Sequence, residues 1–101
     1  MNFTEEQIQH IEDMAGLGYG FEMIAMYLNI DKNMIKTEFE DENSEFRQHF
    51  ERGKLVSDVD IEKKLIGLSK EGNIDAIQEL NKIKFYRSVE NVKKEVKNES
   101  Q

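Results

Sequence analysis

Residues 18–35 read GYGFEMIAMYLNIDKNMI, and their apolar positions recur with the spacing of two short helices joined by a tight turn. The turn is predicted over residues 29–31, where Asp31 can cap the second helix by accepting its free N–H groups. The side chains predicted to face the interior are Ile24, Ala25, Leu28, Ile30, Met34 and Ile35. We therefore predict a helix-turn-helix with helices over about residues 21–28 and 32–41.

A helix before this motif is delimited by its own end signals. Thr4 followed three residues later by Gln7 forms a capping box, and Gly16 follows an apolar stripe with helical spacing. We predict that this helix covers about residues 5–15. It would complete a three-helix N-terminal unit over residues 1–42.

The remaining sequence indicates more helices. One is predicted from about residue 43 to Gly53, which would end it in a left-handed conformation, and another from Ser57 to Gly72. Asn73 is expected to begin the last helix. The predicted fold class is all-α, in which the helix-turn-helix unit is followed by a helical hairpin over residues 43–96 and a flexible tail over residues 97–101.

The last helix is longer than one small domain needs. From Ile74 to Val96 it would extend about 34 Å at 1.5 Å per residue, more than the first three helices can cover. We expect a second subunit to cover this edge, and the alternative is one helix that frays beyond Tyr86. The residues predicted to mediate oligomerisation are Ile61, Leu65, Leu68, Ile77, Leu80, Ile83, Tyr86, Val89 and Val92.

Length and composition limit the class of protein. The chain has 101 residues, no cysteine and no proline, which favours one helical domain without disulfides or a thiolate metal site. The N-terminal residues MNFTEEQ do not resemble a signal peptide, and apolar runs are short. We therefore expect a cytoplasmic protein that does not enter a membrane.

Charge is unevenly distributed. The net charge is −7, and residues 1–45 carry two basic against eleven acidic side chains, whereas residues 46–101 carry twelve against ten. Residues 82–97 are the most basic, with six basic and two acidic side chains, while the end of the predicted third helix is acidic and unsuited to phosphate. The alternative use of these surfaces is contact between subunits. The candidate DNA contacts are Lys32, Lys36, Arg47, Arg52, Lys54, Lys93, Lys94 and Lys97.

Candidate chemistry is sparse. His10 and His49 are far apart in sequence, and neither has the spacing of a helical metal pair. The acidic run over residues 38–42 has no calcium-loop pattern, and the glycines at 16, 18 and 20 are not followed by the Lys-Ser/Thr of a phosphate loop. We predict a non-enzyme without metal or cofactor.

The order of motifs over residues 17–80 resembles the small subunit of tailed-phage terminases. Residues 18–35 resemble the G-x-x-x-x-x-IA-x-x-L-x-I pattern of its N-terminal domain, and residues 46–53 its F-x-x-x-(Y/F)-x-x-G step. The matches to the L-x-x-x-A-x-x-GN-x-x-A-I-x-x-L segment of its hairpin are Leu65, Ser69, Gly72, Asn73, Ala76, Ile77 and Leu80. The sequence departs from the family in Ser69, which replaces an alanine, and in its acidic third helix.

The resemblance implies a non-enzymatic homo-oligomeric ring in the host cytoplasm. Such a protein binds double-stranded DNA at the viral packaging site and passes it to the terminase large subunit, whose ATPase it regulates. A protein-interaction or assembly adaptor built on the same scaffold is the alternative, with its acidic third helix docking a basic partner. A transcription regulator is a further alternative.

Overall fold

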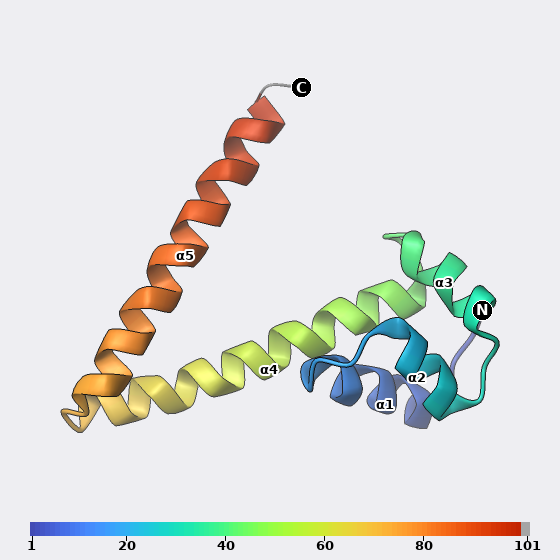
Figure 1. Ribbon diagram of the computed structural model, residues 1–101, viewed down its shortest axis with the longest axis horizontal. Helices are drawn as coiled ribbons and strands as arrows, with labels where there is room; N and C mark the ends of the chain where they lie inside the picture. Colours follow the sequence, from blue (N-terminus) through green and yellow to red (C-terminus); the bar gives the residue numbers. More distant parts are fainter. Residues whose placement is uncertain (100–101) are drawn as a thin grey trace. The chain divides into compact units, whose positions relative to one another are not determined.

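The structure, a computed structural model, describes residues 1–99 and the side chains of residues 1–95. It contains five α-helices: α1 (Glu5–Gly16), α2 (Phe21–Leu28), α3 (Lys32–Glu40), α4 (Glu45–Lys70) and α5 (Ile74–Glu99) (Figure 1). No strand occurs among residues 1–99, so the predicted all-α class is confirmed. The chain divides into two compact units, Met1–Asp60 and Ile61–Gln101. The boundary predicted at residue 42 therefore lies inside the first unit.

The end signals of the first three helices act as predicted. The Thr4 hydroxyl accepts a hydrogen bond from the Gln7 N–H, and the Gln7 side chain accepts one from the Thr4 N–H, which completes the capping box of α1. The Asp31 carboxylate accepts hydrogen bonds from the N–H groups of Asn33 and Met34 at the start of α3. Asn29 ends α2 in the left-handed conformation.

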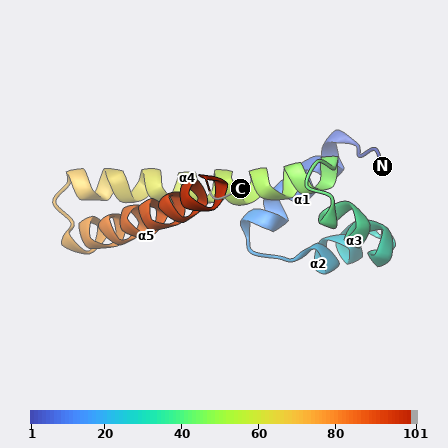
Figure 2. The ribbon, with the colours of Figure 1, turned by 90° about the horizontal axis from the view of Figure 1, so that it is seen from above.

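One hydrophobic core holds the first unit together. Figures 1 and 2 show α1, α2 and α3 gathered around the first half of α4. The buried residues of this core are Ile11, Ala15, Ile24, Ala25, Ile35, Phe46 and Phe50. Leu28 and Ile30 are partly buried against it, whereas Met34, predicted to be buried, is 53% exposed. Met34 points outward because α3 places Ile35 at the core and turns the preceding residue toward solvent.

The predicted break at Gly53 is wrong. α4 continues without interruption from Glu45 to Lys70, so Ser57 lies within the helix and is not its cap. Gly53 is buried, and a Cβ atom built on it would lie 2.2 Å from the Glu12 carbonyl oxygen. The glycine permits close approach of α1 and α4, which explains its position better than a helix end does.

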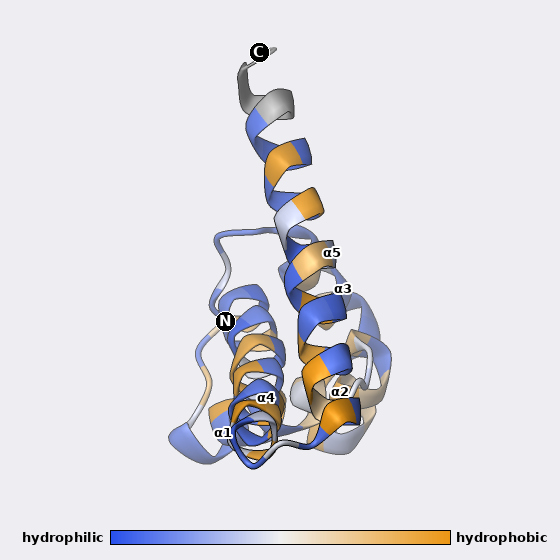
Figure 3. Cartoon of the chain, turned by 90° about the vertical axis from the view of Figure 1, so that its left-hand side faces the viewer, coloured by the Kyte–Doolittle hydropathy of each residue, from blue (hydrophilic) through white to orange (hydrophobic). Residues whose placement is uncertain are grey.

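The second unit is a helical hairpin. Gly72 has φ +87°, and the Asn73 carboxamide accepts a hydrogen bond from the Ala76 N–H, as expected for the end of one helix and the start of the next. Ala76 and Leu80 of α5 are buried. The backbone of α5 continues to Glu99, three residues past the predicted helix end, and Figure 3 shows hydrophobic and hydrophilic turns alternating along it.

Candidate nucleic-acid interface

The charge of α3 is polarised along its length. Its first two turns expose Lys32, Asn33, Lys36 and Thr37, none of which is acidic. The helix ends at Glu40, so the following Asp41 and Glu42 of the acidic run lie outside it. Glu38 and Glu40 remain on α3, so the acidic character predicted for the end of this helix is confined to its last turn. The exposed N-terminal half of α3 is instead neutral to basic, and we name these four residues the α3 face.

The α3 face is held by packing on its opposite side. Ile35 is fully buried, and the rings of Phe21 and Phe39 stack with their centroids 4.9 Å apart. The three-residue turn between α2 and α3 needs a positive φ at Asn29, where asparagine is among the most tolerant non-glycine residues. Rigid support of this kind fixes the direction in which an exposed helix face points.

The α3 face combines two kinds of side chain. Lysines attract phosphate groups as mobile cations, whereas an asparagine amide can pair with the edge of adenine. Lys32 Nζ lies 3.9 Å from Glu22 Oε2, and both side chains are about 60% exposed, so this ion pair is weak and yields readily to a competing anion. The Thr37 hydroxyl donates to the backbone carbonyl oxygen of Asn33 at 3.1 Å, and residue Asn33 is exposed.

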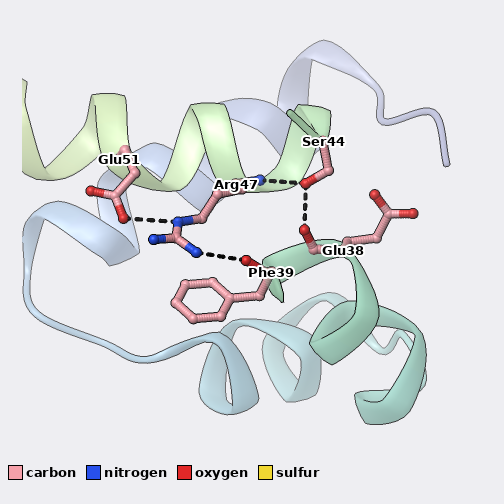
Figure 4. Close-up of polar contacts among 5 residues, drawn as sticks. All are labelled: Glu38, Phe39, Ser44, Arg47 and Glu51. Atoms are coloured by element: carbon pink, nitrogen blue, oxygen red, sulfur yellow. Dashed lines mark hydrogen bonds and ion pairs between the residues drawn. The ribbon is translucent and has the colours of Figure 1, made fainter. Parts of the chain in front are cut away.

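Arg47, a candidate DNA contact, is engaged inside the first unit (Figure 4). Its Nη1 donates to the Phe39 carbonyl oxygen at 2.7 Å, and its guanidinium lies 4.5 Å from the centroid of the Phe39 ring. Its Nε donates to Glu51 Oε1 at 3.0 Å, and its backbone N–H donates to the Ser44 hydroxyl. Arg47 therefore joins the end of α3 to α4, and the structure gives it a structural role.

The other cationic candidates are distributed over two helices. Arg52 of α4 is exposed with its Nε 3.7 Å from Glu12 Oε2, and Lys54 Nζ lies 5.8 Å from the centre of the Phe50 ring. Lys93 and Lys94 are exposed on α5. The side chain of Lys97 lies outside the described residues. Lys32 and Lys36 share the exposed side of α3 with Asn33 and Thr37, whose side chains can form hydrogen bonds with base edges.

The oligomerisation candidates differ in exposure. Leu80 is buried in the hairpin, and Leu65, Ile83 and Val89 are partly buried. The exposed candidates are Ile61, Leu68, Ile77, Tyr86 and Val92. Leu80 therefore stabilises the hairpin itself, and the exposed members are the ones available to another chain.

The two histidines make separate contacts. The His10 ring meets the Tyr27 ring edge-on at 5.1 Å, and His49 Nδ1 lies 2.7 Å from Glu12 Oε2. Among the described residues no group of three or more His, Cys, Asp or Glu side chains is placed to hold a metal ion. Nor is any described helix both long enough and apolar enough to cross a membrane.

Sequence reasoning missed Asn33 and Thr37. Both share the solvent side of α3 with Lys36, at spacings of three and one, and this could have been read from the helical period. The contact of Arg47 with Phe39 carried no comparable signal, because it joins residues eight positions apart on two helices.

Comparison of the chain with protein families, with curated proteins and with solved structures returns no significant match.

Proposed function

We propose that this chain is the DNA-recognition subunit of a viral genome-packaging machine, similar to the small subunit of a phage terminase. In this proposal α2 and α3 form a DNA-binding helix-turn-helix, and α3 enters the major groove. The observation that carries it is the α3 face, because lysines and an asparagine are exposed on the first two turns of the helix that follows the turn. These are the positions from which a recognition helix contacts bases.

The acidic side chains elsewhere in the first unit lower its affinity for DNA. The Glu38 carboxylate lies 3.8 Å from the N-terminal amine, which partly compensates its charge. Residues 1–60 still carry fourteen acidic against five basic side chains, so each copy binds DNA weakly. A homo-oligomer would hold several α3 faces on one duplex, and the linked sites would bind together far more tightly than one does.

The remaining parts of the function follow from the family resemblance. The oligomer has no enzymatic activity of its own, acts in the host cytoplasm, and presents packaging-site DNA to the terminase large subunit. The exposed apolar residues of α5, among them Tyr86 and Val92, support assembly because they offer area to a neighbouring chain.

A DNA-binding assay on the full chain tests the proposal. We expect Lys36→Ala to weaken binding to every duplex and to lower the slope of log K against log salt by about 0.9. Asn33→Ala should reduce discrimination at one base position by about 1 to 3 kcal/mol. Lys63→Ala removes an exposed lysine from α4 and serves as the matched control.

The outcomes separate the alternatives. Loss of binding with Lys93→Ala and Lys94→Ala, but not with Lys36→Ala, would move the DNA contact to α5. A chain that binds no duplex even at low salt would support the adaptor, for which the acidic surface of the first unit and its exposed apolar side chains are the favouring observations. Binding to one operator without any effect on a packaging ATPase would support a transcription regulator.

A further inference from the structure

The outward side of α2 is apolar although it faces solvent. Ile24 and Ala25 are buried, whereas Met23, Met26 and Tyr27 are 52%, 72% and 60% exposed. We name these three exposed residues the methionine face. Methionine side chains are flexible and polarizable, and they are over-represented on surfaces that bind other proteins.

The methionine face lies within an entirely acidic segment. Residues 1–31 contain six acidic side chains and no lysine or arginine. Glu22 precedes Met23 on α2, and its side chain is 61% exposed, with Lys32 Nζ 3.9 Å from its carboxylate in a weak surface ion pair. At the other side of the face, Glu6 is 86% exposed and lies 3.6 Å from His10, whose ring contacts Tyr27. An apolar surface bordered by carboxylates fits a partner that is both apolar and basic.

The chain itself carries a surface of that kind. One side of α5 faces inward in the hairpin through Ala76 and Leu80. Phe85, Val89 and Val92 follow the spacing i, i+4, i+7 on the opposite side of the helix, where Phe85 is 64% and Val92 is 55% exposed. The exposed charges that flank this stripe are three lysines and one carboxylate, Lys82, Lys84, Lys93 and Glu95, so the surface is basic on balance. We name the stripe with its flanking lysines the basic stripe.

We propose that the methionine face of one copy binds the basic stripe of a second copy. The two surfaces match in apolar character and are opposite in charge, whereas pairing of two basic stripes would bring like charges together. Each copy carries both halves of the contact, so the interface joins different surfaces and propagates from copy to copy until it closes. Neither surface includes the α3 face, but Glu22 lies 3.9 Å from Lys32 of that face and Lys93 is a candidate DNA contact. Self-association is therefore measured without DNA, so that the pairing is tested separately from the proposed function.

Reciprocal charge reversal in the full chain tests this pairing. One variant carries Glu6→Lys with Glu22→Lys, and the other carries Lys82→Glu with Lys93→Glu. Each variant alone presents like charges on both halves of the contact, so sedimentation at low salt should show self-association weakened by about tenfold or more. An equimolar mixture should regain association, because the reversed face of each variant meets the complementary surface of the other.

Replacement of the exposed methionines by a polar residue tests the apolar part of the proposed contact. Met23→Ser with Met26→Ser should also weaken association, whereas Met34→Ser removes an exposed methionine from α3 and should leave it unchanged. Circular dichroism confirms that each variant is folded. A monomeric wild-type chain, variants that retain wild-type association, or a mixture that shows no recovery would each overturn the proposal. DNA binding is measured separately, so its loss would affect only the proposed function.

Discussion

The main chain of Gly53 in α4 lies directly against the main chain of Glu12 in α1. A Cβ atom on Gly53 would come within 2.2 Å of the Glu12 carbonyl oxygen and 2.5 Å of the Glu12 Cα. The contact continues at Gly16, where a Cβ atom would lie 3.0 Å from the Gly53 carbonyl oxygen. Two helix backbones therefore approach each other through glycines, and the neighbouring atoms at Glu12 belong to the backbone and cannot rotate away.

Gly53→Ala is expected to lower the free energy of unfolding by about 2 kcal/mol or more, because overpacking a close contact costs more than the roughly 1 kcal/mol that alanine gains in a helix. Gly67→Ala is the matched control in the same helix, since a Cβ atom at Gly67 would meet nothing within 4 Å. It should raise stability by about 0.5 to 1 kcal/mol. Urea titration followed by circular dichroism measures both variants, and equal effects would contradict the role assigned to Gly53.

Gly53 and Glu12 also show which parts of the fold the sequence could predict and which it could not. A capping box, an aspartate cap and a glycine at a helix end are local signals, and they located both ends of α1 and the start of α3 to within about one residue. In the sequence, Gly53 cannot be distinguished from a glycine that ends a helix. Its actual role depends on Glu12, which is 41 positions away and has no detectable pairing signal in one sequence.

Asn29 adopts φ +56° and ψ +46° at the end of α2. Asn29→Ala should lower stability by about 1 kcal/mol, because a Cβ without a local polar partner makes the left-handed conformation costly, whereas Asn29→Gly should be neutral or slightly stabilising. Asn33→Ala changes an asparagine within α3 and should not destabilise the fold. Thermal unfolding measures the stability of the three variants. An Asn29→Ala chain as stable as wild type would contradict the left-handed conformation assigned to residue 29.

Arg47→Met is expected to lower stability by about 1 to 3 kcal/mol. It removes the charge-assisted hydrogen bond to the Phe39 carbonyl oxygen and the contact with the Phe39 ring. Arg52→Met, which removes a mostly exposed cation, should cost less than about 1 kcal/mol. Urea titration compares the two. Weaker DNA binding by folded Arg47→Met, without a loss of stability, would restore Arg47 as a DNA contact.

The candidate site was less predictable than the fold for a physical reason. Counting the charges of α3 along the sequence gives only the net charge of the helix. A ligand contacts one side of the helix, and the helical period and the helix end decide which side chains lie on that side. Asp41 and Glu42 follow the end of α3, and Glu38 lies close to the N-terminal amine, so of the acidic run only the exposed Glu40 shares the side of α3 that carries Asn33 and Lys36.

Ser69 of α4 buries its hydroxyl oxygen, which has no hydrogen-bond partner among the described residues. Ser69→Ala should therefore raise stability by about 1 kcal/mol, since it removes an unsatisfied buried group and adds a better helix former. Ser88→Ala, on the exposed surface of α5, should add only about 0.5 kcal/mol from helix propensity. Thermal unfolding compares them, and a destabilised Ser69→Ala chain would reveal a partner for the hydroxyl.

The stability of the hairpin should depend on pH through Glu62 and Arg87. Arg87 Nη1 donates to Glu62 Oε1 at 2.5 Å, and this hydrogen bond, together with the positive charge, lowers the pKa of Glu62 from its ordinary 4.5 although desolvation opposes the shift. The folded chain therefore binds this proton more weakly than the unfolded chain does. The stabilisation is complete above the ordinary pKa and disappears as pH falls through the folded-state pKa.

The Glu62→Gln variant should have a lower melting temperature than wild type at neutral pH, and this difference should disappear in acid. In the Arg87→Met background the same substitution should have little effect at any pH, and a gap that persists there would assign the stabilisation to another partner of Glu62.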